Sequence, residues 1–330
     1  MLCCSQRQQS AFSRRELAAA RKTLLQQLLA ARIATDSSKQ VVDSRIEFAV
    51  CLQRKGEGGL SIGRLECSYT NSLSLCSARR APEKLWKYRM ESEARSDGGK
   101  KLKLRGKELL SVPLEIFELG ELQALEMSPE RESCLHYRMS RLPRAIGQLA
   151  NLTVLRLDTN DLRELPPEVG ALHRLEVLSL SNNQLSRLPA QAEGLQSLHS
   201  LHLANNHFEE LPAQVCQLRR LSFLDASDNK IKFIPADIGN LERLETLLLY
   251  FNALESLPDS ICSLGSLCTL WLGKNHLRSL PSRFGQLANL EWGRSHCSSN
   301  FEDNPLESPP PEICRGGPEE ISRYFAVWDE

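Results

Sequence analysis

The sequence of 330 residues contains no apolar run close to the roughly 18 residues that a membrane-spanning helix requires. It also has no excess charge of either sign, because 41 Lys and Arg residues balance 41 Asp and Glu residues. This balance argues against bulk electrostatic attraction to nucleic acid or to an anionic membrane. Leu2 stands where N-myristoylation requires a glycine, which excludes that modification.

Motifs that carry catalysis are missing as well. The sequence has no G-x-x-x-x-G-K-[ST] phosphate loop and no C-x-x-C pair, and its seven histidines are scattered. No Ser/His/Asp or Cys/His set can be assembled from these positions. We therefore expect no enzyme activity, no cofactor and no metal site.

The 11 cysteines are odd in number and irregularly spaced, and no apolar segment follows the basic residues at the start of the chain. Both features favour reduced thiols in the cytoplasm over a secreted disulfide framework. Two other locations stay open. The first 35 residues are rich in arginine and poor in acids, as mitochondrial presequences are. Membrane association would require lipidation of Cys3 and Cys4.

Leucine recurs every 23 residues through most of the chain. The regular units begin at Leu152, Leu175, Leu198, Leu221, Leu244, Leu267 and Leu290. Two further units, at 99 and 122, fit the same register, which gives nine units in all. A fixed period of this length is the signature of a solenoid, in which each unit buries its apolar face against its neighbours.

Each repeated position has a physical role. In L-x-x-L-x-L the leucines of a short strand point into the core and the intervening residues face solvent. An L-P pair then turns the chain toward an outer helical or 3₁₀ stretch. Asparagine recurs just after the strand, where a buried amide can satisfy backbone groups of the turning chain. This predicted ladder comprises Asn160, Asn183, Asn206, Asn229, Asn252, Asn275 and Asn304.

The L-P-x-x-I-G-x-L form of the unit resembles the intracellular Ras-group-related leucine-rich-repeat proteins, over about residues 99–326. The resemblance implies an α/β solenoid, a leucine-rich-repeat horseshoe with a parallel concave β-sheet and short outer helices. It also implies a non-enzymatic scaffold or adaptor that binds a protein partner on the concave face, often in small-GTPase or kinase signalling. Because the repeated residues are structural, they indicate the fold and not the identity of the partner.

The repeats divide the chain into three parts. Residues 1–98 lack the repeat; we expect an amphipathic helix over 13–34, largely flexible chain, and a helix over 82–96 that caps the first repeat. Residues 99–313 form the nine repeats. Residues 314–330 are predicted to form a capping helix that begins near Pro318. The alternative to a scaffold is a structural protein tethered through its N-terminal helix.

Two units are interrupted at an equivalent place between strand and asparagine turn. The second unit carries extra residues near 128–136, and the ninth near 293–299. They are either polar loops that border the concave face, or tolerated insertions or an imperfect gene model. The sequence leaves this choice open.

The solvent-facing strand positions become aromatic and acidic toward the C-terminus. We predict a partner-binding patch made of Phe223, Asp225, Asp228, Leu248, Tyr250, Trp271 and Trp292. The alternatives are that Trp292 and Phe251 turn into the core, or that the loop at 293–299 covers the patch.

A nucleic-acid surface would need a continuous basic stripe along these positions. Lys101, Lys103 and Arg105 begin one in the first unit, but from Leu152 to Lys274 only Arg156 and Lys274 continue it. We therefore expect a protein partner and no nucleic acid.

Overall fold

The computed structural model describes residues 99–104, 106–129, 137–292 and 299–327. All of them belong to the second of two compact units, which spans Arg80–Glu330. The helices expected over 13–34 and 82–96 lie outside the described residues, as does most of each interruption, and they stay predictions.

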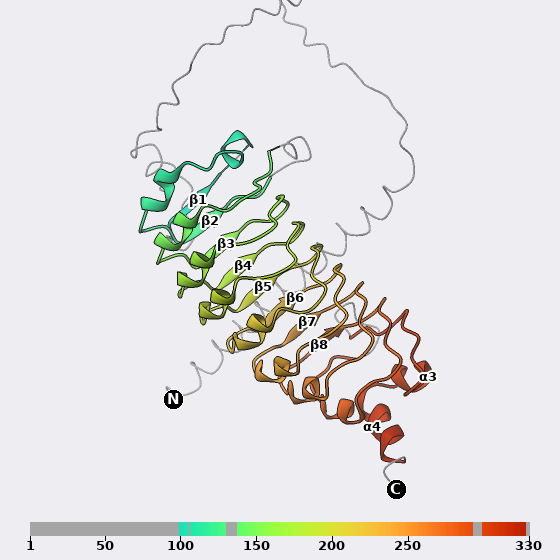
Figure 1. Ribbon diagram of the computed structural model, residues 1–330. Helices are drawn as coiled ribbons and strands as arrows, with labels where there is room; N and C mark the ends of the chain where they lie inside the picture. The colour runs from blue at the N-terminus through green and yellow to red at the C-terminus, as the bar shows by residue number, and fades with distance from the viewer. Residues whose placement is uncertain (1–98, 105, 130–136, 293–298, 328–330) are drawn as a thin grey trace, which may run out of the picture. The chain divides into compact units, whose positions relative to one another are not determined.

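Eight three-residue strands form one sheet in which every neighbour is parallel and the order follows the sequence (Figure 1). The predicted parallel sheet of an α/β solenoid is thus confirmed. Its strands are β1 (Lys101–Lys103), β2 (Ala124–Glu126), β3 (Val154–Arg156), β4 (Val177–Ser179), β5 (Ser200–His202), β6 (Phe223–Asp225), β7 (Thr246–Leu248) and β8 (Thr269–Trp271).

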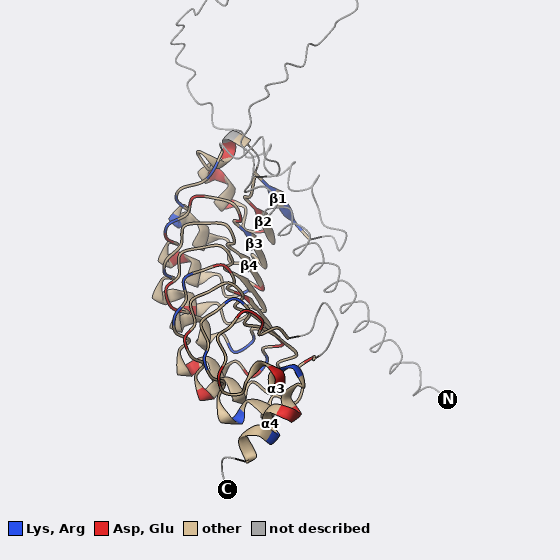
Figure 2. Ribbon diagram, turned by 90° about the vertical axis from the view of Figure 1, so that its right-hand side faces the viewer, with Lys and Arg blue, Asp and Glu red and all other residues tan. Residues whose placement is uncertain are grey.

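From η3 onward, a short 3₁₀ helix lies on the opposite side of each repeat from its strand (Figure 2). Each of these begins directly after a proline, whose restricted φ suits this turn and which lacks the N–H that would go unpaired there. They are η3 (Leu114–Glu118), η5 (Arg144–Gln148), η6 (Pro167–Ala171), η7 (Ala190–Gly194), η8 (Ala213–Gln217), η9 (Ala236–Asn240), η10 (Asp259–Ser263) and η11 (Ser282–Gln286). A further 3₁₀ helix, η2 (Gly106–Leu109), lies in the turn directly after β1.

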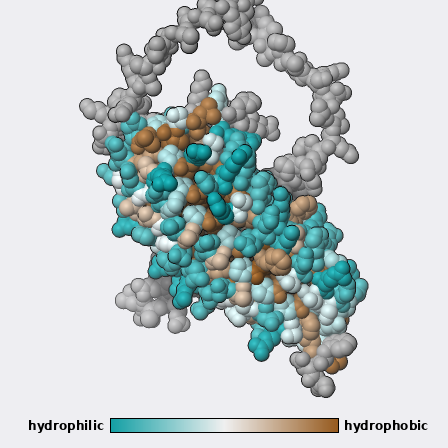
Figure 3. Space-filling model, viewed as in Figure 1, coloured by the Kyte–Doolittle hydropathy of each residue, from teal (hydrophilic) through white to brown (hydrophobic). Residues whose placement is uncertain are grey.

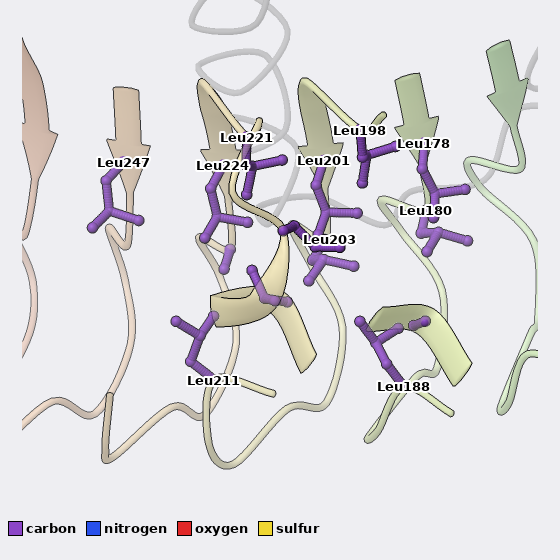
Figure 4. Close-up of a cluster of buried hydrophobic side chains, with 14 of the residues drawn as sticks. Leu178, Leu180, Leu188, Leu198, Leu201, Leu203, Leu211, Leu221, Leu224 and Leu247 are labelled. Atoms are coloured by element: carbon purple, nitrogen blue, oxygen red, sulfur yellow. The ribbon is translucent and has the colours of Figure 1, made fainter. Parts of the chain in front are cut away.

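The core is a stack of leucine layers between strands and 3₁₀ helices (Figure 4). The central residue of each strand, such as Leu178, Leu201 or Leu224, is at most 2% exposed. Each leucine buried in this way contributes roughly 1.5–3 kcal/mol, and most of its contacts come from adjacent repeats. Successive residues of a strand point to opposite faces of the sheet, so the residues before and after each central leucine lie on the face away from the core. We call that face the concave face.

The predicted ninth strand does not form at Leu290–Trp292. Instead Asn300 bridges to Trp271, six residues later in the sequence than the 23-residue period places the partner of Trp271. The amide of Leu272 donates to the Asn300 carbonyl over 2.7 Å, and that of Lys274 donates to the Glu302 carbonyl over 2.9 Å. The insertion therefore shifts which residues of the ninth unit face the concave side.

Two helices end the described chain, α3 (Pro311–Arg315), which begins within the ninth repeat directly after Pro310, and α4 (Pro318–Ala326). The sequence pattern places a helix start at Pro318 but does not indicate α3. Helix α4 packs closely on η11, since a Cβ atom added to Gly285 would lie 2.5 Å from the Ser322 hydroxyl oxygen. Ile321 is fully buried in this contact region, whereas Tyr324 is only partly covered. The helix thus covers the C-terminal end of the leucine core.

The first described repeat differs from the rest in its surface. The face shown in Figure 3 is mostly hydrophilic, with hydrophobic residues gathered over this N-terminal repeat. Leu110 and Leu114 are 59% and 62% exposed. An end of a solenoid core requires a cover, and the helix predicted over 82–96 remains the sequence-based candidate for it.

Candidate protein-interaction surface

The asparagine ladder lies directly behind the concave face and fixes the turn that follows every strand. The Asn206 side chain shows the arrangement: its Nδ2 donates to the carbonyls of Leu180 and Leu203, each over 3.0 Å. Its Oδ1 accepts from the amide of Leu185, also over 3.0 Å. One amide therefore ties two consecutive repeats together. The same bonds are made by Asn160, Asn183, Asn229, Asn252, Asn275 and Asn304.

The residue just before each ladder asparagine has a left-handed backbone. Asparagine occupies two of these positions, Asn182 and Asn205, and tolerates the conformation well. A β-branched or bulky residue there is strained, as at Thr159 (φ 60°) and Phe251 (φ 60°). The side chain of Phe251 is also 51% exposed, so burial of the ring does not offset the backbone strain.

Aromatic side chains gather on the concave face at the C-terminal strands. We call Phe223, Tyr250, Phe251 and Trp271 the aromatic patch. The rings of Tyr250 and Phe251 are 6.3 Å apart, and the Lys274 ammonium lies 5.5 Å from each centroid. Such cation–π contacts contribute about 0.5–1 kcal/mol at exposed sites. Tyr250 and Phe251, two of the four rings of the aromatic patch, therefore share contacts with each other and with one cation.

Gly273 is closely surrounded by the following repeat and by the ring of Tyr250. A Cβ atom added there would lie 2.9 Å from the Asn300 side-chain oxygen, 3.0 Å from the Glu302 carbonyl and 3.1 Å from the Tyr250 ring. Tyr250 can therefore extend across the neighbouring repeat because Gly273 leaves room. The sequence shows both residues but not this dependence.

Two residues of the predicted patch, Asp225 and Leu248, are buried in the structure. Asp225 is only 7% exposed, and its Oδ1 accepts a 3.0 Å hydrogen bond from the Ser227 amide. Leu248, which lies between Asp225 and Trp271 in the sheet register, is 4% exposed. The Asp225 carboxylate therefore caps a turn and is largely withdrawn from solvent, and its contact with basic residues of a partner stays a prediction. Asp228 is partly buried at a left-handed turn position.

Trp292 does not lie in the aromatic patch, which corrects its predicted place. Its indole N–H donates to the Arg315 carbonyl over 3.1 Å, and its ring stacks on Phe301 at 5.2 Å. Gly317 approaches the ring so closely that an added Cβ would lie 3.1 Å away. Trp292 thus fastens the C-terminal helices onto the last repeat. In the sequence, the interruption of the repeat directly after Trp292 could have indicated that its side chain takes a different position.

His202 borders the aromatic patch, although the pattern alone did not single it out. Its ring is 4.8 Å from that of Phe223, and its Nε2 is 2.9 Å from the Ser200 hydroxyl. Burial lowers the pKa of His202, and the charge of Arg156 acts in the same direction. The carboxylates of Asp225 and Asp158 oppose this without reversing it.

The described residues hold no group of three or more His, Cys, Asp or Glu that could bind a metal ion. No helix among them is long and apolar enough to cross a membrane. Burial raises the pKa of the Cys216 thiol to about 12 and that of Cys262 to about 11, which leaves both poorly nucleophilic.

Comparison with known proteins supports the same fold. The family model for a leucine-rich repeat region matches residues 168–247. A leucine-rich-repeat protein of Leptospira interrogans is 30% identical, with a TM-score of 0.54; the match covers 68% of this chain and 58% of that one. Internalin C2 of Listeria monocytogenes is 22% identical, with a TM-score of 0.52, and the match covers 62% of this chain and 81% of that one. No curated protein matches the chain.

The chain therefore contains a leucine-rich-repeat region folded as a solenoid, a fold that supports a role as a protein-interaction scaffold. The Ras-group-related subgroup stays a prediction.

Proposed function

We propose that this leucine-rich-repeat protein is a non-enzymatic scaffold that binds a protein partner through the aromatic patch on its concave face. The observation that carries the proposal is the presence of Phe223, Tyr250, Phe251 and Trp271 on one part of the concave face, beside strands with small polar side chains. Aromatic anchors of this kind supply most of the free energy at protein interfaces.

Three features support this assignment over a purely structural role for the patch. Phe251 keeps a strained backbone and a half-exposed ring. The Lys274 ammonium lies 5.5 Å from the centroids of two of the rings, a contact that favours their arrangement before binding. The leucine core, in contrast, is already complete beneath the sheet without these side chains.

The cellular setting is part of the proposal. Cys216, Cys262 and Cys314 are free thiols, which suits the cytoplasm. The resemblance of the repeat unit to Ras-group-related proteins favours a partner in small-GTPase or kinase signalling. If the partner is a small GTPase, the amount of it that is recovered should differ between GDP and a non-hydrolysable GTP analogue.

The test is affinity purification with mass spectrometry, with wild type and the Tyr250→Ala/Trp271→Ala variant side by side. Removal of two anchors should weaken partner binding by about 1,000-fold, since each such truncation costs roughly 2 kcal/mol. Proteins recovered with wild type should be lost from the variant. Circular dichroism checks that both are folded.

Phe233→Ala is the matched control, because Phe233 is an exposed aromatic (58%) that lies outside the strands. It should leave partner recovery unchanged. Equal recovery by wild type and by the folded Tyr250→Ala/Trp271→Ala variant would overturn the proposal.

A further inference from the structure

The N-terminal end of the concave face carries a cluster of cations around one carboxylate. The Lys101 ammonium lies 2.8 Å from the Glu126 carboxylate, the Lys103 ammonium 3.8 Å and the Arg156 guanidinium 3.9 Å. Figure 2 shows this arrangement as basic residues on β1 and β3 on either side of an acidic residue on β2. We call these four residues the basic cluster.

The Glu126 carboxylate stays charged among the three cations. Burial by itself would raise the pKa of Glu126, but a hydrogen bond from Lys101 and the charges of Lys103 and Arg156 outweigh it and lower that pKa. Glu126 is therefore ionised at neutral pH. Arg156 presents positive charge to solvent at this end of the face, since its side chain is 54% exposed.

Apart from His202, the strands between the basic cluster and the aromatic patch carry mostly small side chains on this face. Ser179 lies on β4, Ser200 lies on β5, and Ala204 follows β5. Asp158 stands at the boundary, where its carboxylate accepts from the Ser179 hydroxyl over 2.6 Å and from the Ser181 amide over 2.9 Å. The middle of the concave face therefore carries mostly smaller side chains than the charged end and the aromatic end.

The strand spacing sets the distance between the two ends. From β2, at the centre of the basic cluster, to β7, at the centre of the aromatic patch, there are five strand steps. Neighbouring strands lie about 4.8 Å apart, so the two centres are about 24 Å apart. An extended chain covers about 3.3–3.6 Å per residue, and hence needs about seven residues to bridge them.

We propose that the concave face binds an extended peptide segment of its partner, with acidic residues over the basic cluster and an apolar or aromatic residue about seven positions away over the aromatic patch. This proposal rests on the proposed function and adds the chemistry of the partner. Charge complementarity at one end fixes the direction of the segment, and the aromatic end supplies most of its affinity.

The test uses a library of random 16-residue peptides displayed on phage and selected on the folded protein. Selection on wild type should enrich peptides in which an acidic residue stands about seven positions from an apolar or aromatic residue. An enriched peptide is then synthesised with a fluorescent label, and its Kd is measured by fluorescence anisotropy.

A double-mutant cycle assigns the charge contact. Arg156→Gln in the protein and acid-to-amide replacement in the peptide should each weaken binding by about tenfold, and the two together by little more than either alone. Lys101→Gln/Lys103→Gln is the second variant, which keeps the test independent of one side chain. Arg219→Gln/Arg220→Gln, two exposed arginines in the turn before β6, is the control and should bind like wild type.

The outcomes separate this proposal from the proposed function. Enrichment of apolar residues alone, lost with Tyr250→Ala/Trp271→Ala but not with Arg156→Gln, would leave the aromatic patch as a binding site and overturn the acidic segment. Enrichment that is the same on wild type and on the Tyr250→Ala/Trp271→Ala variant would overturn both.

Discussion

The asparagine ladder and the concave face belong to the same repeats but follow opposite rules. Seven asparagines make the same hydrogen bonds at the same place in seven consecutive turns. A few residues earlier, in each of the eight strands, the concave residue changes from lysine to glutamate, arginine, serine, histidine, aspartate, leucine and tryptophan. The ladder is uniform because unpaired backbone groups demand one particular side chain. The concave positions carry no such demand, so information about a partner can reside there.

This difference predicts that ladder residues control stability and that concave residues control binding. The most severe test on the ladder side is Asn206→Ala, in the middle of the solenoid. It removes the hydrogen bonds to the carbonyls of Leu180 and Leu203 and leaves the Leu185 amide without its acceptor. Since each buried group left unsatisfied costs about 1–3 kcal/mol, we expect a loss of about 3 kcal/mol or more. Urea unfolding followed by circular dichroism measures it.

Gln196→Ala is the control for removal of a side-chain amide, because Gln196 is exposed in the turn before β5. It should change the free energy of unfolding by less than about 0.5 kcal/mol. If both variants lost the same small amount, the ladder would not be what holds neighbouring repeats together. The fraction of Asn206→Ala that stays folded should bind the partner as wild type does.

Phe251 tests the reverse case, a residue that costs stability and serves binding. Asparagine accepts a left-handed backbone far better than phenylalanine does, so Phe251→Asn should raise the free energy of unfolding by about 0.5–1 kcal/mol. The same change should weaken partner binding, because the exposed ring is removed from the aromatic patch. Thermal unfolding and anisotropy with a selected peptide give the two quantities.

Thr159→Asn is matched to this variant, because Thr159 has the same left-handed backbone but lies two strands or more from the aromatic patch. It should stabilise the protein by a similar amount and leave binding unchanged. Weaker binding by Thr159→Asn, or unchanged binding by Phe251→Asn, would contradict the division of roles between strained turn and aromatic patch.

The sequence was sufficient for most of the fold, because the fold depends on spacing. A period of 23 residues places one leucine in each strand centre, and the L-P pair places each 3₁₀ helix directly after its proline. Both follow from local backbone rules that act within one repeat. The ninth strand was misplaced because an insertion breaks the spacing, and only the hydrogen bonds of Asn300 reveal where the chain rejoins.

The candidate site was less accessible to sequence reasoning, because it depends on contacts between repeats. The pattern placed Tyr250 and Trp271 on the concave face, but it could not show that Asp225 would be captured by the Ser227 amide. It also could not show that Trp292 would find an acceptor in the Arg315 carbonyl, 23 residues away. Spacing tells which face a side chain takes, whereas its accessibility depends on neighbours that spacing does not specify.

His202, at the border between the small polar strands and the aromatic patch, gives the smallest of the expected effects. Burial lowers its pKa, so the folded protein binds fewer protons here than the unfolded chain does. Stability from this site is therefore present above about pH 6.5, the ordinary histidine value, and decreases as the pH falls through it. Urea unfolding at pH 7.5 and pH 5.5 should show a smaller loss of stability on acidification for His202→Gln than for wild type. His199→Gln, which removes an exposed imidazole from the preceding turn, should keep the wild-type difference. If His202→Gln also kept it, the proton uptake of the unfolded chain would come from other groups, and His202 would serve the Phe223 ring by packing alone.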